Sequence, residues 1–273
     1  MQHILRKQLL IILFSCLFVS GAGQELFRVP AAFQAVGNAS VSLKSPLSVF
    51  SNPAGAASGA LSAGILFDNR FLLKDLSTRS AFLVLPVQNS RFLLSFSQFG
   101  NDGYRETKIS AGLARQLSPV LSAGLQFQYF SLFMAENDRR PGTVLADLGV
   151  RLQLSDFSLG LQYFNPYGLS VCENTLVVEY LSVIRVGVHK TFQEVFLLTA
   201  ELFAEQSATV EPRVGIQYLL KKQLSLRCGV ETQYGLFSLG VGYTHKNVCT
   251  DLTFSYHQYL GLSPSFTLYF QRP

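Results

Sequence analysis

From Leu61 to the C-terminus the sequence repeats one pattern, in which apolar side chains alternate with small or polar ones in segments separated by turns. Successive side chains of a β-strand point to opposite faces, so a period of two predicts strands with one apolar face. Leu125 and Phe127, for example, share a face, while Gln126 and Gln128 lie on the other. Segments of about ten residues with this alternation are typical of a transmembrane β-barrel, which places one face in lipid and the other in the lumen.

The composition favours a barrel in lipid over a barrel in water. The chain is 48% hydrophobic and only 14% charged, and its mean hydropathy is +0.27. A soluble domain usually carries about 25% charged residues. A soluble β-sandwich or lipocalin-like barrel is the alternative, but it would expose too much apolar surface to water, whereas the outer face of a membrane barrel must be apolar.

The N-terminus has the features of an export signal. A basic start precedes an apolar core from Leu9 to Val19, and small residues follow at 21–23. This order predicts a secretory signal peptide over residues 1–23. The apolar core is too short for a transmembrane helix, which needs about 20 residues. A lipoprotein signal ending at Cys16 is the alternative, although apolar residues follow this cysteine where polar ones are usual.

The alternating segments predict an all-β fold, a transmembrane antiparallel barrel of about 14 strands. We place the strands at 61–67, 78–86, 91–99, 107–115, 120–130, 143–154, 157–163, 180–190, 195–204, 212–220, 224–231, 236–244, 248–257 and 265–271. Twelve strands are the alternative, because the segments at 78–86 and 157–163 are short.

Short and long connections alternate along the chain, as periplasmic turns and outer loops do in outer-membrane barrels. The first connection is long, so both termini are expected to be periplasmic. We therefore expect a signal peptide (1–23), an N-terminal periplasmic segment (24–60) and an outer-membrane β-barrel (61–273) in the cell outer membrane of a Gram-negative bacterium.

Charged side chains of both signs fall on the inward face of the predicted strands. Such a mixed set predicts a structural network that satisfies charges in the lumen, because a strongly ion-selective pore would carry one sign of charge at its constriction. Asp147 with Arg151 and Arg227 with Glu231 lie on shared faces, and Glu201 is expected to meet Arg213. The network comprises Asp147, Arg151, Arg185, Glu201, Arg213, Arg227, Glu231 and Asp251, with Lys108 on the same inward face.

The sequence predicts no catalytic, metal or cofactor site. Ser255 and His257 share an inward face, but alternate residues of a strand lie about 6.5 to 7 Å apart, beyond direct hydrogen bonding. The mature cysteines have no paired metal-ligand spacing. The chain also has no basic run or motif for nucleic-acid binding.

One outer loop carries a candidate docking surface. The segment from Phe164 to Val178 is long and contains exposed apolar residues, which favour contact with a partner protein. The same residues would also be expected if the loop only folded over the barrel rim. The candidate docking residues are Pro166, Tyr167, Leu169 and Val171.

The segment before the barrel carries a family resemblance. Residues 31–43, rich in Ala and other small residues, and the motif Asn52-Pro53-Ala54-Gly55 resemble the start of FadL-like outer-membrane proteins. That superfamily includes transporters of hydrocarbons and fatty acids, and the PorV/PorQ proteins of type IX secretion. The resemblance implies a segment that packs against or into the barrel mouth. A plain rigid turn explains Asn52 to Gly55 equally well, because an Asn before Pro favours extended backbone.

The short loops make the PorV/PorQ group the closest in proportions. The resemblance therefore implies a non-enzymatic subunit or adaptor of an envelope assembly, for type IX-like protein secretion or surface attachment. Its expected partners are outer-membrane lipid and other envelope or secretion proteins. The alternative is a FadL-like passive conduit for hydrophobic small molecules.

Overall fold

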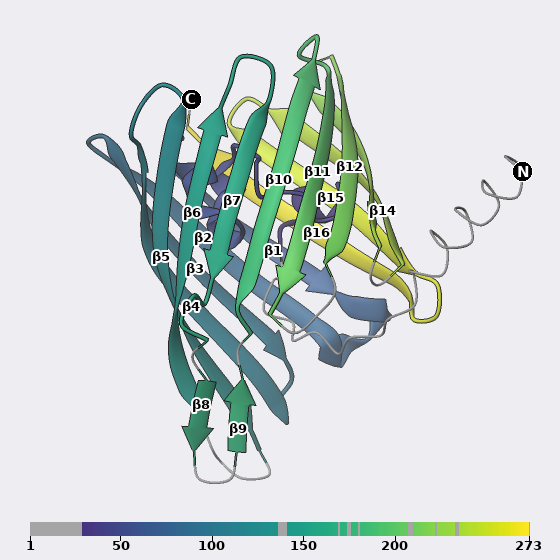
Figure 1. Ribbon diagram of the computed structural model, residues 1–273. Coiled ribbons are helices and arrows are strands. Elements are labelled where there is room, and N and C mark those ends of the chain that lie inside the picture. The colour runs from purple at the N-terminus through teal and green to yellow at the C-terminus, as the bar shows by residue number, and fades with distance from the viewer. Residues whose placement is uncertain are drawn as a thin grey trace, which may run out of the picture.

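Fourteen antiparallel strands close into a single barrel (Figure 1). The computed structural model describes residues 29–272 apart from 136–140, 169, 174–175, 180, 207–209, 222 and 233–234. The predicted signal peptide therefore lies outside the described residues. Among the residues that are described, no helix is long and apolar enough to cross a membrane.

Each barrel strand pairs with its neighbours in the chain, except that β7 pairs with β10 and the last strand pairs with the first. The prediction of 14 strands is confirmed, and the alternative of twelve is wrong. The strands are β1 (Ser62–Asn69), β2 (Ser77–Val87), β3 (Ser90–Gly100), β4 (Tyr104–Gln116), β5 (Leu121–Met134), β6 (Gly142–Gln153), β7 (Ser158–Phe164), β10 (Val183–Phe192), β11 (Phe196–Glu205), β12 (Glu211–Leu220), β13 (Leu224–Glu231), β14 (Leu236–His245), β15 (Val248–His257) and β16 (Gly261–Gln271).

The two faces of the barrel wall differ as the alternation predicts. On β10, Ile184 and Val186 point outward and are exposed, whereas Val183 and Arg185 point inward and are buried. The same division recurs in the other strands, where the exposed positions are mostly Leu, Val, Ile, Phe and Tyr. The outer surface is thus apolar, as contact with acyl chains requires.

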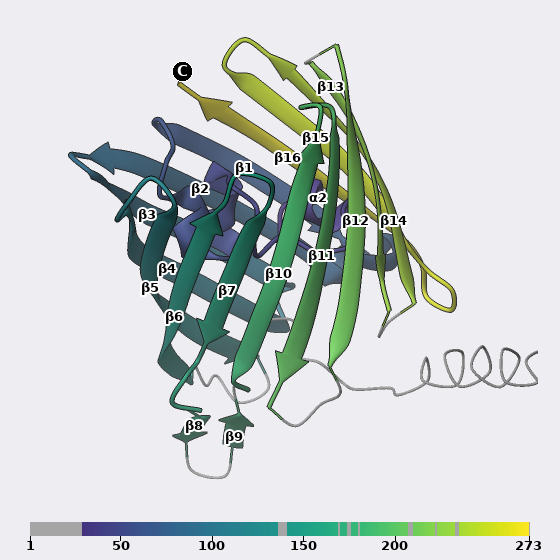
Figure 2. The ribbon, with the colours of Figure 1, turned by 45° about the horizontal axis from the view of Figure 1, so that its top comes forward.

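The two ends of the barrel differ in their connections. Short turns join β2 to β3, β4 to β5 and β6 to β7, at the same end where β1 starts and β16 finishes. We call this the periplasmic end, because short turns mark that side in outer-membrane barrels. At the opposite, outer end, β8 (Ser170–Glu173) and β9 (Leu176–Glu179) form a separate hairpin that projects beyond the barrel (Figures 1 and 2). The sequence predicts only a loop at this place.

The N-terminal segment lies inside the barrel, as both views show in purple (Figures 1 and 2). It contains α2 (Ala31–Gln34) and two short 3-10 helices, η1 (Pro46–Phe50) and η2 (Pro53–Ala56). Nearly all its described side chains up to Ala57 are buried. We call residues 29–60 the plug. The sequence predicts a segment at the barrel mouth, and the structure places it within the lumen.

One side of the plug is held by apolar packing. Phe33, Leu47 and Val49 form a buried cluster with Val84 of β2 and Leu93 of β3. Burying a side chain of this size stabilises the folded state by about 1.5–3 kcal/mol. The other side of the plug faces a polar wall, described below.

Candidate functional site

The backbone of the plug lies directly against glycines of the barrel wall. A β-carbon on Gly160 would lie 2.2 Å from the carbonyl oxygen of Val41, and one on Gly215 would lie 2.2 Å from that of Val36. Any larger residue would push the plug away from the wall. Several of these glycines are opposite one another on paired strands. The glycines that touch the plug in this way are Gly124, Gly149, Gly160, Gly187, Gly215, Gly229 and Gly240.

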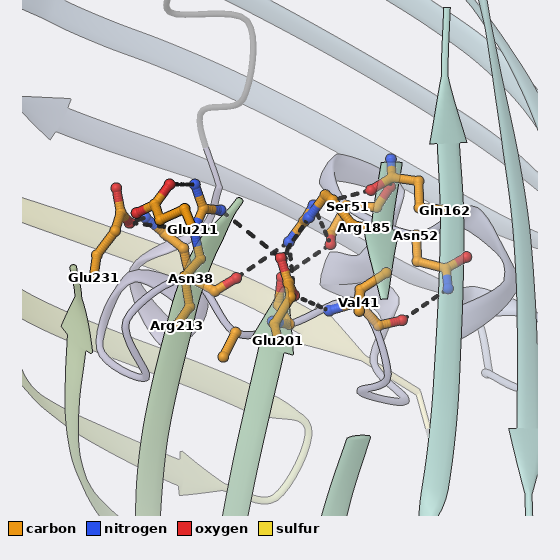
Figure 3. A network of polar contacts seen from close by, with 12 residues as sticks. Asn38, Val41, Ser51, Asn52, Gln162, Arg185, Glu201, Glu211, Arg213 and Glu231 are labelled. Carbon is orange, nitrogen blue, oxygen red and sulfur yellow. Dashed lines mark hydrogen bonds and ion pairs between the residues drawn. The ribbon is translucent and has the colours of Figure 1, made fainter. Parts of the chain in front are cut away.

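Arg185 of β10 is the centre of the polar wall and is 1% exposed (Figure 3). Its Nε donates to Oε1 of Glu201 on β11 at 2.6 Å, and its Nη1 donates to the Ser51 hydroxyl of the plug at 3.0 Å. Its Nη2 donates to the Asn38 carbonyl and to the Ser40 hydroxyl, each at 3.1 Å. Nη1 also donates to the side-chain oxygen of Gln162 on β7 at 3.0 Å. One guanidinium therefore joins three wall strands to two parts of the plug.

Glu201 holds the same plug segment through its second carboxylate oxygen. Its Oε2 accepts hydrogen bonds from the backbone N–H groups of Ser40 and Val41, both at 2.9 Å. These donors belong to a turn with no regular secondary structure to satisfy them. Since a buried charge is stable only when it is paired and hydrogen-bonded, the plug completes the environment of the Arg185–Glu201 pair.

Arg213 of β12 is a second node of the network (Figure 3). It pairs with Glu211 at 3.0 Å, lies 3.8 Å from Glu201, as the sequence predicts, and lies 4.0 Å from Glu231. Its guanidinium also covers the ring of Phe203, 4.1 Å from the centroid. Glu211 is not among the residues predicted from the sequence, although it lies two residues before Arg213 and therefore on the same face of β12.

Two predicted pairs are replaced by other contacts. Asp147 accepts hydrogen bonds from Gln128 and Gln162, and no ion pair between it and Arg151 is found among the described residues. Arg151 instead donates to the Ser42 carbonyl of the plug at 2.7 Å. A closer acceptor from the plug thus takes the place of the expected partner.

Arg227 likewise pairs with Asp251 of β15 and not with Glu231. The two strands are separated by β14, whose Gly242 leaves the space between them open. A β-carbon on Gly242 would lie 2.7 Å from Nη1 of Arg227 and 2.4 Å from Oδ1 of Asp251. Glu231 is left to accept a hydrogen bond from the Asn38 side chain of the plug.

Asn52 both shapes a turn and attaches the plug to the wall. Its side-chain oxygen accepts from Ala54 N at 3.0 Å, which caps η2. The two N–H groups of its amide are shared among three carbonyl oxygens, those of Val41 at 2.7 Å, Val150 at 3.1 Å and Leu161 at 3.3 Å. Val150 and Leu161 belong to β6 and β7. Asn52 therefore stabilises a turn within the plug and also binds the plug to the barrel wall.

An apolar surface lies on the inner wall at the outer side of this network. On each of three strands, an apolar residue takes the inward-facing position that is two residues nearer to the outer end than a charged residue of the network. These positions are Val183 beside Arg185, Phe203 beside Glu201, and Leu145 beside Asp147. All are buried, and the rings of Phe130 and Phe164 lie 6.4 Å apart. We call these residues the apolar wall cluster: Phe130, Leu145, Phe164, Val183 and Phe203.

The remaining candidate residues lie apart from this network. Pro166 is half-buried, and Tyr167 is exposed on the outer loop, while Leu169 and the side chain of Val171 lie outside the described residues. Ser255 contacts Ser238, with 2.8 Å between the hydroxyl oxygens. His257 Nδ1 accepts backbone N–H groups of its own loop. Within the described part of the chain, no cluster of potential metal ligands occurs.

Comparison with known proteins identifies the fold. Neither a family model nor a curated protein sequence matches the chain. Among solved structures, the monoaromatic hydrocarbon channel CymD is similar, with a TM-score of 0.68 and 12% identity over 92% of this chain and 99% of that one.

Two further structures agree with this result. The toluene transporter TodX of Pseudomonas putida has a TM-score of 0.64 and 12% identity over 90% of this chain and 98% of its own. A FadL homologue of Pseudomonas aeruginosa has a TM-score of 0.59 and 14% identity over 88% of this chain and 97% of its own.

These neighbours are FadL-family outer-membrane channels. At such low identity the likeness shows the fold alone, and the place of this chain in an outer membrane rests on the apolar outer face of its closed barrel. The protein is an outer-membrane β-barrel of the Gram-negative type.

Proposed function

We propose that the protein is a passive outer-membrane channel for hydrophobic small molecules. The observation that carries this proposal is the apolar wall cluster. The interior of an outer-membrane barrel is normally polar. Unlike the apolar residues of β2 and β3 that hold the plug, this cluster contains no residue of the plug. Placed between the outer end and the plug, this cluster suits an apolar ligand that has entered from outside.

The architecture supports the same proposal. Two solved structures that share this fold across most of the chain are described as a monoaromatic hydrocarbon channel and as a toluene transporter. An aromatic ring gains favourable burial and edge-to-face contacts from rings such as Phe130 and Phe164. Since the plug occupies the lumen, we propose that passage requires the plug to shift or the ligand to move around its edge.

Reconstituted liposomes provide the test. Liposomes that contain the protein are expected to take up toluene or a fluorescent apolar probe faster than empty liposomes. Replacing Phe130 and Phe164 by Ala should slow this uptake severalfold, because both rings are removed from the lumen. The matched control is Phe254→Ala, which removes a lipid-facing ring of β15 that is 43% exposed. Uptake equal to that of empty liposomes would rule out the channel.

A second candidate is the role of subunit or adaptor in an envelope assembly, of the PorV/PorQ kind. It is favoured by the filled lumen and by the β8–β9 hairpin, which projects from the outer end as a surface for a partner protein. Affinity purification in mild detergent separates the candidates. Envelope proteins that co-purify with the full chain, and are lost when residues 170–179 are removed, would favour the adaptor; recovery of the barrel alone would favour the channel.

A further inference from the structure

A row of polar side chains crosses the outward face of the barrel near its outer end. Arg79 of β2 is paired with Gln98 of β3, Gln98 with Thr107 of β4, and Thr107 with Ser131 of β5. All four residues belong to the outward set, because their sequence neighbours Thr78, Ser97, Lys108 and Phe130 point inward.

The row directly beneath it, one step toward the middle of the membrane, is apolar. It consists of Ala81, Phe96, Ile109 and Tyr129, which are paired across the same four strands. The change from apolar to polar between adjacent rows marks the depth at which this wall leaves the acyl chains and meets the lipid head groups.

The length of these strands explains why the wall extends so far. β4 and β5 contain 13 and 14 residues, whereas β13 contains 8 and β14 contains 10. At about 3.3 Å per residue, a strand as long as β5 exceeds the apolar band of about 25 Å even when it is tilted. On the opposite wall the outward residues stay apolar up to the outer end, as with Val230 and Phe237, so the polar row belongs to the β2–β5 side.

The outward-facing residues of these strands carry charge of one sign. Arg105 of β4 also points outward, one row beyond Thr107, and its guanidinium lies 5.2 Å from the ring centroid of Phe133. Glu106, the acidic residue nearest to it on β4, belongs to the inward face and accepts a hydrogen bond from Tyr104. Among the described barrel strands, every acidic residue faces the lumen. Arg79 and Arg105 are thus available to an anion from the membrane side.

We propose that Arg79, Gln98, Arg105, Thr107 and Ser131, which we call the outer basic row, bind the phosphorylated sugar head group of an outer-leaflet lipid, lipopolysaccharide. Arginine binds phosphate through parallel N–H donors, and the amide and hydroxyl groups beside the arginines suit sugar hydroxyls. The row is continuous with the lipid-facing surface, which fixes its occupant at head-group depth and favours a lipid over a soluble protein.

The spacing of the two arginines indicates the kind of head group. They lie two strands and two residues apart, which places their Cα atoms about 12 Å from each other in a regular sheet. The guanidinium of Arg105 lies over the ring of Phe133 on β5, on the side away from Arg79 of β2, so the two guanidinium groups do not converge on one phosphate. The row therefore fits a head group that carries phosphates at separate positions, with one near each arginine.

The first test uses the unaltered protein, delipidated in an uncharged detergent. Native mass spectrometry during titration should show saturable binding of lipopolysaccharide, and at least tenfold weaker binding of the same lipid after enzymatic removal of its phosphates. Binding should also weaken as salt is raised, because the contact is electrostatic. Equal affinity for the phosphorylated and dephosphorylated lipid would overturn the proposal.

The second test locates the site. The double variant Arg79→Gln/Arg105→Gln should bind the phosphorylated lipid at least tenfold more weakly. The matched control, Arg115→Gln/Lys190→Gln, removes the same charge from outward positions at the periplasmic end and should keep the affinity of the original chain. Equal loss in both variants would show a nonspecific charge effect and overturn the assigned site. This proposal does not depend on the channel function, because neither arginine faces the lumen.

Discussion

A buried arginine is stable only while its N–H donors have acceptors, and Arg185 meets this condition with residues of the wall and the plug. We expect Arg185→Ala to destabilise the barrel by about 3–5 kcal/mol, because the change leaves Glu201 buried without its closest cation. The midpoint of heat-dependent gel mobility measures this loss.

The control for this variant is a similar ion pair at the surface. Lys190 and Asp156 lie 3.8 Å apart, with side chains that are 44% and 71% exposed. Exposed pairs contribute about 0–1 kcal/mol, so Lys190→Ala should leave the midpoint nearly unchanged. An equal shift for both variants would mean that Arg185 is not held in a dry network.

The two roles of Asn52 can be separated by one substitution. Asn52→Asp keeps the oxygen that caps η2, since Asp is an equally good N-cap, but replaces the amide donor by an oxygen facing three carbonyl groups. We expect a clear loss of stability, of about 2 kcal/mol or more, from the unmade hydrogen bonds and the buried charge. A stability equal to that of the original chain would mean that Asn52 only caps η2 and that its amide does not help to hold the plug.

At the scale of elements, the strands could be predicted because the period of two is a local signal. The plug could not be placed, because its position depends on contacts between distant residues, such as the hydrogen bond from Ala31 N to the Thr267 hydroxyl. In the sequence, Gly160 and Gly215 appear only as small residues on an inward face. The partner of Arg227 was missed for a similar reason, since Gly242 lets the side chain reach across a whole strand.

The wall glycines give a prediction about the plug as an element. Gly160→Ala adds a β-carbon 2.2 Å from the Val41 carbonyl oxygen, so the plug must move away from β7. We expect a raised ionic conductance in planar bilayers, because a displaced plug no longer fills the lumen. Gly103→Ala, in a loop where the nearest atom is a side-chain oxygen at 3.4 Å, is the control and should conduct like the original chain.

At the scale of the whole molecule, the outer surface must match the bilayer. Leu239 lies in the middle of β14, paired with Cys228 and Phe254, and is 51% exposed. Leu239→Arg should cost about 2–4 kcal/mol, the expected loss near the membrane midplane. Val248→Arg, at the periplasmic end of β15, should cost about 0–1 kcal/mol, as is usual near the interface. Denaturant titration in lipid vesicles compares them, and equal losses would contradict the proposed depth of these residues.

The barrel should be able to fold without the plug. All fourteen strands are joined by their own ladders, including the closure between β1 and β16, so the barrel should fold when residues 29–60 are deleted. It should be less stable, because the apolar partners of Phe33 and Leu47 become exposed and Arg185 loses its plug acceptors. Water can then solvate the lumen charges, and bilayer recordings should show an open, ohmic pore. A truncated chain that is folded but still closed would mean that the wall side chains alone block the lumen.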